Sequence, residues 1–171
     1  MPYFKVGNHI YSESYAVADA IVTRAGRPEM LGKGDQDKIT VSMLRSVNLD
    51  IKTLAFGAFK RTLQDLQQNL AGEYEKSIVP KLEAYVNVLG TRPFVMYYVT
   101  IVDFELAWYA HMFDYIEQNT GVKNPFNAFP SLVKMIGHLR SLPGLSQYLN
   151  SSKGPNSRPI YPPYLIKFLE N

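Results

Sequence analysis

The sequence contains no cysteine. This absence excludes disulfide bonds, thiolate metal sites and a cysteine nucleophile at once. No apolar run approaches the roughly 18 residues that a membrane-spanning helix needs, and the first residues lack the charged segment and apolar stretch of a signal peptide. These absences predict a protein without a membrane span that resides in the cytoplasm or in another reducing compartment.

Basic clusters and metal-ligand spacings are also absent. The net charge is only +3, and Lys60-Arg61 is the only adjacent basic pair, which argues against a nucleic-acid partner. None of His9, His111 and His138 has a neighbour at i+3 or i+4 suited to metal ligation, and no glycine-rich phosphate loop follows a predicted strand. We therefore predict no metal site and no catalytic triad, and we expect His111 to be a core histidine.

Apolar and aromatic residues, in contrast, are plentiful. They make up 46% and 13% of the 171 residues, which argues against disorder and is enough for one domain with a real core. Apolar residues recur mostly at the spacing of helices. The composition and this periodicity predict a mainly α-helical protein.

The stretch 99–113 is predicted to begin the helix around which the others pack. Thr100 is placed as the N-cap, and the Asp103 side chain can accept a hydrogen bond from the N–H of the cap, which makes a capping box. Val99 and Phe104 can form a hydrophobic staple at the same end. The rest of this helix, including the only tryptophan of the sequence, is apolar nearly all round, so we expect it to be buried on all faces.

The remaining elements follow from alternation, helical spacing and stop signals. A short hairpin is expected over residues 2–11, with its turn at Gly7-Asn8, and Ser12-Glu13-Ser14 offers an N-cap to the helix that follows. Further helices are predicted over 14–25, 39–54, 62–89 with a second half starting at Pro80, 130–139 and 145–149. Residues 151–171 read as an ordered coil laid over the body.

The second of these helices carries an acidic residue beside its apolar stripe. The stripe comprises Ile39, Met43, Leu44, Val47, Ile51 and Leu54. Asp50 lies one turn from Val47 and from Leu54, at the edge of this face. It is either a surface residue or a buried functional carboxylate, and the spacing alone favours the surface reading.

Several short segments occur together in a characteristic order. They are Pro2-Tyr3-Phe4, Gly7, Glu13-Ser14-Tyr15-Ala16, Leu31-Gly32, Asp50, Val99 to Phe104, Ala128-Phe129-Pro130, Tyr148 to Ser152 and Arg158-Pro159. In this order and at these separations, the chain resembles a cytosolic glutathione transferase, closest to the mu class, over essentially all of its length.

The resemblance implies a fold, a domain division and a site. The fold is a helical bundle like the C-terminal domain of glutathione transferases over residues 32–171, preceded over 1–31 by a partial thioredoxin-like hairpin and helix. Asp50 corresponds to an aspartate that faces the dimer partner in the family. The remnant of a glutathione site is then expected at Met1, Pro2, Glu13, Ser14 and Asp50.

The departures from the family are equally informative. The family fold opens with a strand, helix, strand, helix unit whose hydroxyl activates the glutathione thiol, and this sequence is expected to begin after it, so no residue is assigned a catalytic role. The family's glutamine is Glu13 here, and its carboxylate would repel a glutathione carboxylate. A second tyrosine of mu enzymes falls near Phe59 or Lys60, so its hydroxyl is missing. We expect no cofactor, and at most weak binding of glutathione as a substrate.

Three functions remain open at this point. The first, which we favour, is a truncated and non-catalytic interaction or structural subunit, homo- or hetero-oligomeric, that binds a protein through residues 2–25 or the Asp50 helix face. The second is a glutathione transferase that conjugates glutathione to electrophiles once the missing N-terminal unit is supplied. The third is a binder of apolar small molecules in a cleft between Tyr3, Asp50 and the central helix. The sequence leaves open whether the protein is an enzyme.

Overall fold

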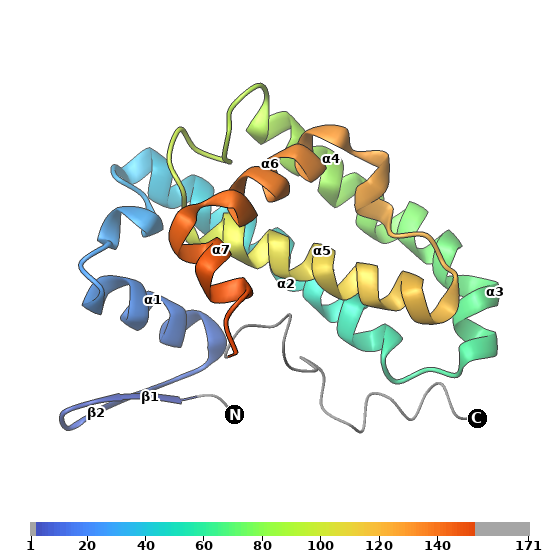
Figure 1. Cartoon of the computed structure of the whole chain (residues 1–171), viewed down its shortest axis with the longest axis horizontal. Helices are drawn as coiled ribbons and strands as arrows, with labels where there is room; N and C mark the ends of the chain where they lie inside the picture. The colour runs from blue at the N-terminus through green and yellow to red at the C-terminus, as the bar shows by residue number, and fades with distance from the viewer. Residues whose placement is uncertain (1–2, 153–171) are drawn as a thin grey trace.

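A computed structural model describes residues 3–152, and it is mainly α-helical as predicted (Figure 1). A two-stranded hairpin precedes a bundle in which α5 lies against α2, α3 and α6. The strands are β1 (Tyr3–Val6) and β2 (His9–Ser12), and short 3-10 turns span η1 (Pro28–Leu31) and η3 (Pro125–Ala128). The α-helices are α1 (Ser14–Arg24), α2 (Asp35–Ala58), α3 (Leu63–Glu73), α4 (Val79–Leu89), α5 (Ile101–Thr120), α6 (Pro130–Ser141) and α7 (Pro143–Leu149).

The hairpin stands at one end of the molecule, beside α1. Its antiparallel strands pair Tyr3 with Ser12 and Val6 with His9 across a turn at Gly7, whose φ of 59° suits glycine. The described sheet contains these two strands alone. An isolated two-stranded hairpin has little stability, so its contact with α1 matters for its position.

The central helix α5 begins with the predicted capping box. The Asp103 carboxylate accepts hydrogen bonds from the Thr100 N–H at 2.7 Å, the Thr100 hydroxyl at 2.8 Å and the Val95 N–H at 2.9 Å. Thr100 and Asp103 are fully buried, and Val99 and Phe104 pack partly buried against the core. Asp103 therefore fixes both the start of α5 and the loop that precedes it.

Burial of α5 on all faces was a wrong prediction. The tryptophan, Trp108, is 39% exposed, and its ring lies 6.2 Å from that of His111, which is itself only half-buried. An apolar run cannot distinguish a helix enclosed on every side from one that leaves a strip uncovered between two neighbours. The core face of α5 is formed by Leu106, Met112 and Phe113.

The long helical stretch over 62–89 is interrupted by a π-turn at η2 (Tyr74–Ile78). Pro80 explains its position, because proline has no N–H and its ring would clash with the carbonyl four residues earlier, at Lys76. The wider turn absorbs this misfit without ending the helix. The predicted second half at Pro80 is thus confirmed as α4, which begins at Val79 and continues α3 through one enlarged turn.

Two helix starts depend on the backbone rather than on side-chain caps. The N-cap of α1 is Glu13, and its side chain makes no cap hydrogen bond. Before α2, Gly32 has φ 111°, and a Cβ built on it would lie 2.5 Å from the Lys38 nitrogen. Only glycine fits this close approach between η1 and the first turn of α2.

Some predictions fall outside the described residues. Met1 and Pro2 are among them, as is the expected coil over 151–171 apart from its first two residues. Among the helices that the structure does describe, none is long and apolar enough to cross a membrane.

Candidate functional site

The predicted site residues Glu13 and Ser14 lie where β2 passes into α1. Glu13 has φ 69° and is the only non-glycine residue with positive φ in the described part of the chain. This backbone conformation is unfavourable for a residue with a Cβ, and such strain concentrates at ligand sites. The one strained non-glycine position of the described chain thus falls on a residue of the predicted remnant, whose role as a site stays a prediction.

Ser14 opens a helix whose first turn is free to receive an anion. Both Glu13 and Ser14 are exposed, no acidic residue follows in the first turn, and no side chain caps it. The free N–H groups and the positive end of the helix dipole favour a carboxylate here. The Glu13 side chain places a negative charge at the same end, which disfavours that carboxylate.

A partly buried charge cluster anchors α1 to the bundle. Arg45 of α2 reaches Asp19 of α1 at 2.7 Å and Glu105 of α5 at 3.4 Å. Its guanidinium lies 4.4 Å from the centre of the Tyr15 ring, and the Tyr15 hydroxyl donates a 2.7 Å hydrogen bond to the Arg45 carbonyl oxygen. Arg45 therefore connects α1, α2 and α5, and it fixes the helix that carries Ser14.

The cluster continues into the core through neutral groups. The Asn48 amide donates to Glu105 at 2.9 Å, and the Tyr85 hydroxyl donates to Asn48 Oδ1 at 2.7 Å. Asn48 and Tyr85 are fully buried, yet these side chains are satisfied. Because buried polar groups without partners are costly, this network sets one arrangement of α2, α4 and α5.

Burial dominates the proton affinities within the cluster. It raises the pKa of Glu105 above its usual value, although the Asn48 hydrogen bond and the Arg45 charge oppose the change. Burial, with a smaller contribution from Glu105, raises the pKa of Tyr15 to about 12. Tyr15 thus stays protonated at neutral pH, which makes it a hydrogen-bond donor and not a base.

Asp50 lies on the exposed face of α2, as the spacing favoured. Its carboxylate pairs with Lys81 of α4 at 2.6 Å. Its charge is also the smallest of the four named causes that act on the pKa of Tyr15. That Asp50 shares a site with Glu13 and Ser14 stays a prediction. In residues 3–152, no three histidine or acidic side chains are grouped to hold a metal ion.

The interpretation of the sequence overlooked Arg45, Asn48 and Glu105. Two local signals pointed to them: Asn48 follows Val47 within the apolar stripe of α2, and Glu105 interrupts the apolar run of α5 between Phe104 and Leu106. A polar residue inside an apolar face has to find a partner. Its partner lies more than 50 residues away in this case, which no local rule reveals.

Comparison with known proteins identifies the family. Residues 50–152, which include most of the bundle and the capping box, match the family described as glutathione S-transferase, C-terminal domain. The chain belongs to this family, with a helical domain preceded by the hairpin and α1.

The relatives found by the comparison are mu-class enzymes, so the chain is mu-like. Glutathione S-transferase Mu 1 of Oryctolagus cuniculus is 26% identical over 155 residues, which cover 90% of this chain and 66% of the relative. Its Macaca fascicularis counterpart is 28% identical over 157 residues with the same coverage. Glutathione S-transferase Mu 2 of Mus musculus is 26% identical over 165 residues, or 94% of this chain and 69% of the relative. The chain thus spans about two thirds of these proteins.

Proposed function

We propose that this glutathione-transferase-like chain is an interaction or structural subunit that is not catalytic by itself. The observation that carries the proposal is the unshielded apolar surface at the hairpin and along α2. Tyr3 on β1 is 71% exposed and Ile10 on β2 is 65% exposed. On α2, Ile39 and Met43 belong to the predicted apolar stripe and are nevertheless at least half exposed. Such surface on a soluble domain marks a place where another chain binds.

The hairpin offers backbone groups as well as apolar side chains. Within the described sheet β1 pairs with β2 alone, so its other edge presents unpaired N–H and C=O groups. A strand edge of this kind recruits an extended segment of another polypeptide. The proposed partner contributes a strand beside β1 with apolar residues facing Tyr3. A second copy of the chain occupies the face of α2 near Asp50.

The non-catalytic part of the proposal rests on the residues at the candidate site. The glutathione-binding remnant is expected at Met1, Pro2, Glu13, Ser14 and Asp50, and two of these side chains, Glu13 and Asp50, are acidic. We assign no hydroxyl of the described residues to thiol activation. Tyr15, whose pKa is raised to about 12, already donates its proton to the Arg45 carbonyl oxygen. We place the boundary between the thioredoxin-like remnant and the helical domain after Leu31, where η1 ends.

Activity measurement tests this part of the proposal directly. The purified 171-residue chain is expected to conjugate glutathione to 1-chloro-2,4-dinitrobenzene no faster than the uncatalysed reaction. A thiol of ordinary pKa, about 8.5 or above, is mostly protonated at neutral pH without an activating group. Saturable turnover above the uncatalysed rate would contradict the proposal.

A second candidate is an active transferase completed by another polypeptide. The strain at Glu13 and the uncapped start of α1 favour it, because both are suited to bind a ligand carboxylate. Adding the N-terminal half of a mu-class relative in trans distinguishes the two. Saturable conjugation that appears only in the mixture, and that Ser14→Asp abolishes, supports this candidate. A mixture that binds but remains inactive supports the structural role.

The oligomeric state provides a further prediction. We expect sedimentation to show that the chain self-associates, and we expect the hairpin amides to exchange rapidly in any monomeric fraction. Replacing Ile10 by lysine should shift the chain toward monomer, because it puts a charge into the exposed apolar surface of the hairpin that the partner is proposed to cover. Tyr97→Lys, at an 82% exposed position between α4 and α5, is the matched control and should leave association unchanged. A stable monomer with slowly exchanging hairpin amides would refute the interaction surface.

A further inference from the structure

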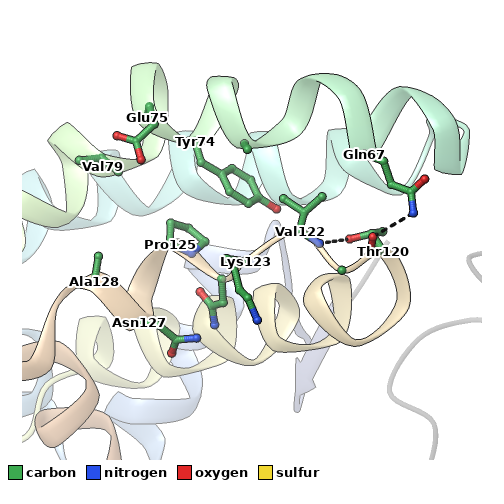
Figure 2. Close-up of a pocket in the computed structure, with 13 residues that line it drawn as sticks. Gln67, Tyr74, Glu75, Val79, Thr120, Val122, Lys123, Pro125, Asn127 and Ala128 are labelled. Atoms are coloured by element: carbon green, nitrogen blue, oxygen red, sulfur yellow. Dashed lines mark hydrogen bonds between the residues drawn. The ribbon is translucent and has the colours of Figure 1, made fainter.

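A cavity of about 660 Å³ lies between the end of α3 and the loop that follows α5 (Figure 2). It is at the opposite end of the bundle from the hairpin and α1. Ala71, Val79, Val122, Pro125 and Ala128 give it apolar walls. Its volume falls within the range of small-molecule sites, which are mostly apolar with a few polar groups.

The loop wall of this cavity is held by side-chain hydrogen bonds. The Asn124 amide donates to Asp114 at 2.8 Å and accepts from the Phe126 N–H at 2.9 Å, and the Thr120 hydroxyl accepts from the Val122 N–H at 3.1 Å. Gln67 of α3 donates to the Thr120 carbonyl at 3.2 Å, which ties the two walls together (Figure 2). The cavity is therefore preformed.

Tyr74 is the polar group without a partner in this region. Tyr74 is only 4% exposed, and among the described residues its hydroxyl has no hydrogen-bond partner. The ring projects from the upper wall toward Val122 on the loop, and it packs edge-on against Phe113 at 5.2 Å. The buried Thr120 and Asn124 nearby are both satisfied. A buried hydroxyl without a partner in the wall of a cavity is a position where a ligand atom can supply the missing hydrogen bond.

The chemistry of Tyr74 defines the partner atom. Burial raises the pKa of Tyr74 well above its usual value, so the hydroxyl is protonated at neutral pH and can donate. Tyr74 also begins the π-turn, a feature that often marks functional sites in helices. The cavity walls favour an apolar body, and the hydroxyl favours a hydrogen-bond acceptor.

We propose that this cavity is a second small-molecule site, which binds compact aromatic or aliphatic molecules bearing a carbonyl-type acceptor, with the Tyr74 hydroxyl as donor. The site is separate from Glu13, Ser14 and Asp50, and it does not depend on the proposed subunit role. All the residues that line it lie between Gln67 and Ala128, within the described part of the chain.

Ligand-observed fluorine NMR tests the proposal with two matched probes. 4-Fluoroacetophenone carries the acceptor, and 1-ethyl-4-fluorobenzene has nearly the same shape without it. The 171-residue chain should bind the ketone saturably, and Tyr74→Phe should weaken ketone binding by about two- to tenfold, the worth of one net hydrogen bond. The same substitution should leave hydrocarbon binding unchanged. Ala71→Leu should fill the cavity and abolish binding of both probes, whereas Gln68→Leu, exposed on α3 but outside the cavity, should not.

Thermal melting distinguishes a variant that changes ligand binding from one that destabilises the fold. Tyr74→Phe should not lower the melting temperature, because it removes a hydroxyl that has no partner. Tyr85→Phe should lower it, because that hydroxyl bonds both Asn48 and the Leu44 carbonyl. The proposal is overturned if the ketone does not bind saturably, or if Ala71→Leu still binds it. Equal affinity for both probes, with no effect of Tyr74→Phe, would overturn the role of Tyr74.

Discussion

Replacement of Arg45 by methionine is expected to remove about 3–5 kcal/mol from the free energy of unfolding, the usual result of breaking a buried ion pair. The variant leaves Glu105, whose side chain is only 13% exposed, without its cation. Asp19 is less affected because its side chain is 43% exposed and can be solvated. Urea denaturation followed by circular dichroism measures the loss.

The size of this loss should depend on pH. Burial already raises the pKa of Glu105, and Arg45 lowers it, so the substitution raises it further. The folded variant then binds a proton more readily than the unfolded chain, so its stability falls as pH rises. The difference between variant and wild type should be largest at neutral pH and should shrink on acidification, as Glu105 becomes neutral.

Two further variants make this prediction specific. Lys81→Met removes the cation of the exposed Asp50 pair, and it should cost less than about 1 kcal/mol. The double variant Arg45→Met with Glu105→Gln should recover part of the loss, because the unpaired buried charge is gone. A single Arg45→Met variant as stable as wild type at neutral pH would show that the cluster does not anchor α1.

The second large effect is expected for Asp103→Ala. The substitution leaves the buried N–H groups of Val95 and Thr100 without acceptors, and each such group costs about 1–3 kcal/mol. The sum exceeds the loss of an ordinary helix cap, which is about 0.5–2 kcal/mol. At about 2–4 °C per kcal/mol for a chain of this size, the melting temperature should fall by at least roughly 4 °C.

Asp35→Ala provides the matched control for this measurement. Asp35 is also an acidic residue in the first turn of a helix, α2, but its side chain is 98% exposed. Its loss should cost no more than about 1 kcal/mol, the value of a favourable dipole interaction at the surface. Similar melting curves for the two variants would mean that Asp103 does not hold the loop before α5.

Local rules predicted the hairpin and the helices of this fold, but not the π-turn within 62–89. Alternation and a turn glycine predicted the hairpin, and the spacing of Thr100 and Asp103 located the start of α5, because each signal lies within a few residues. Trp108 shows where such rules fail: exposure depends on whether another helix covers that strip, and this is decided by packing over the whole chain.

The candidate sites differ in the same way. Glu13 and Ser14 were found through resemblance, whereas the strain at Glu13 becomes visible only in the backbone geometry. Arg45 and Glu105 are 60 residues apart in sequence, so their pairing exists only in the folded bundle. The cavity beside Tyr74 is likewise formed by distant segments, and a single tyrosine in an apolar helix does not announce it.

The π-turn at Tyr74–Ile78 has a consequence for which length changes the helix tolerates. A π-turn already holds one residue more than an α-helical turn, so deleting one residue within it would leave α4 nearly unrotated against α3. Deleting one residue at the start of α4 would instead rotate the rest of α4 by about 100°. Leu82, Tyr85 and Leu89, all buried now, would then turn away from the core. Within this family, single-residue length changes should therefore be found at this short turn and be excluded from the regular part of α4.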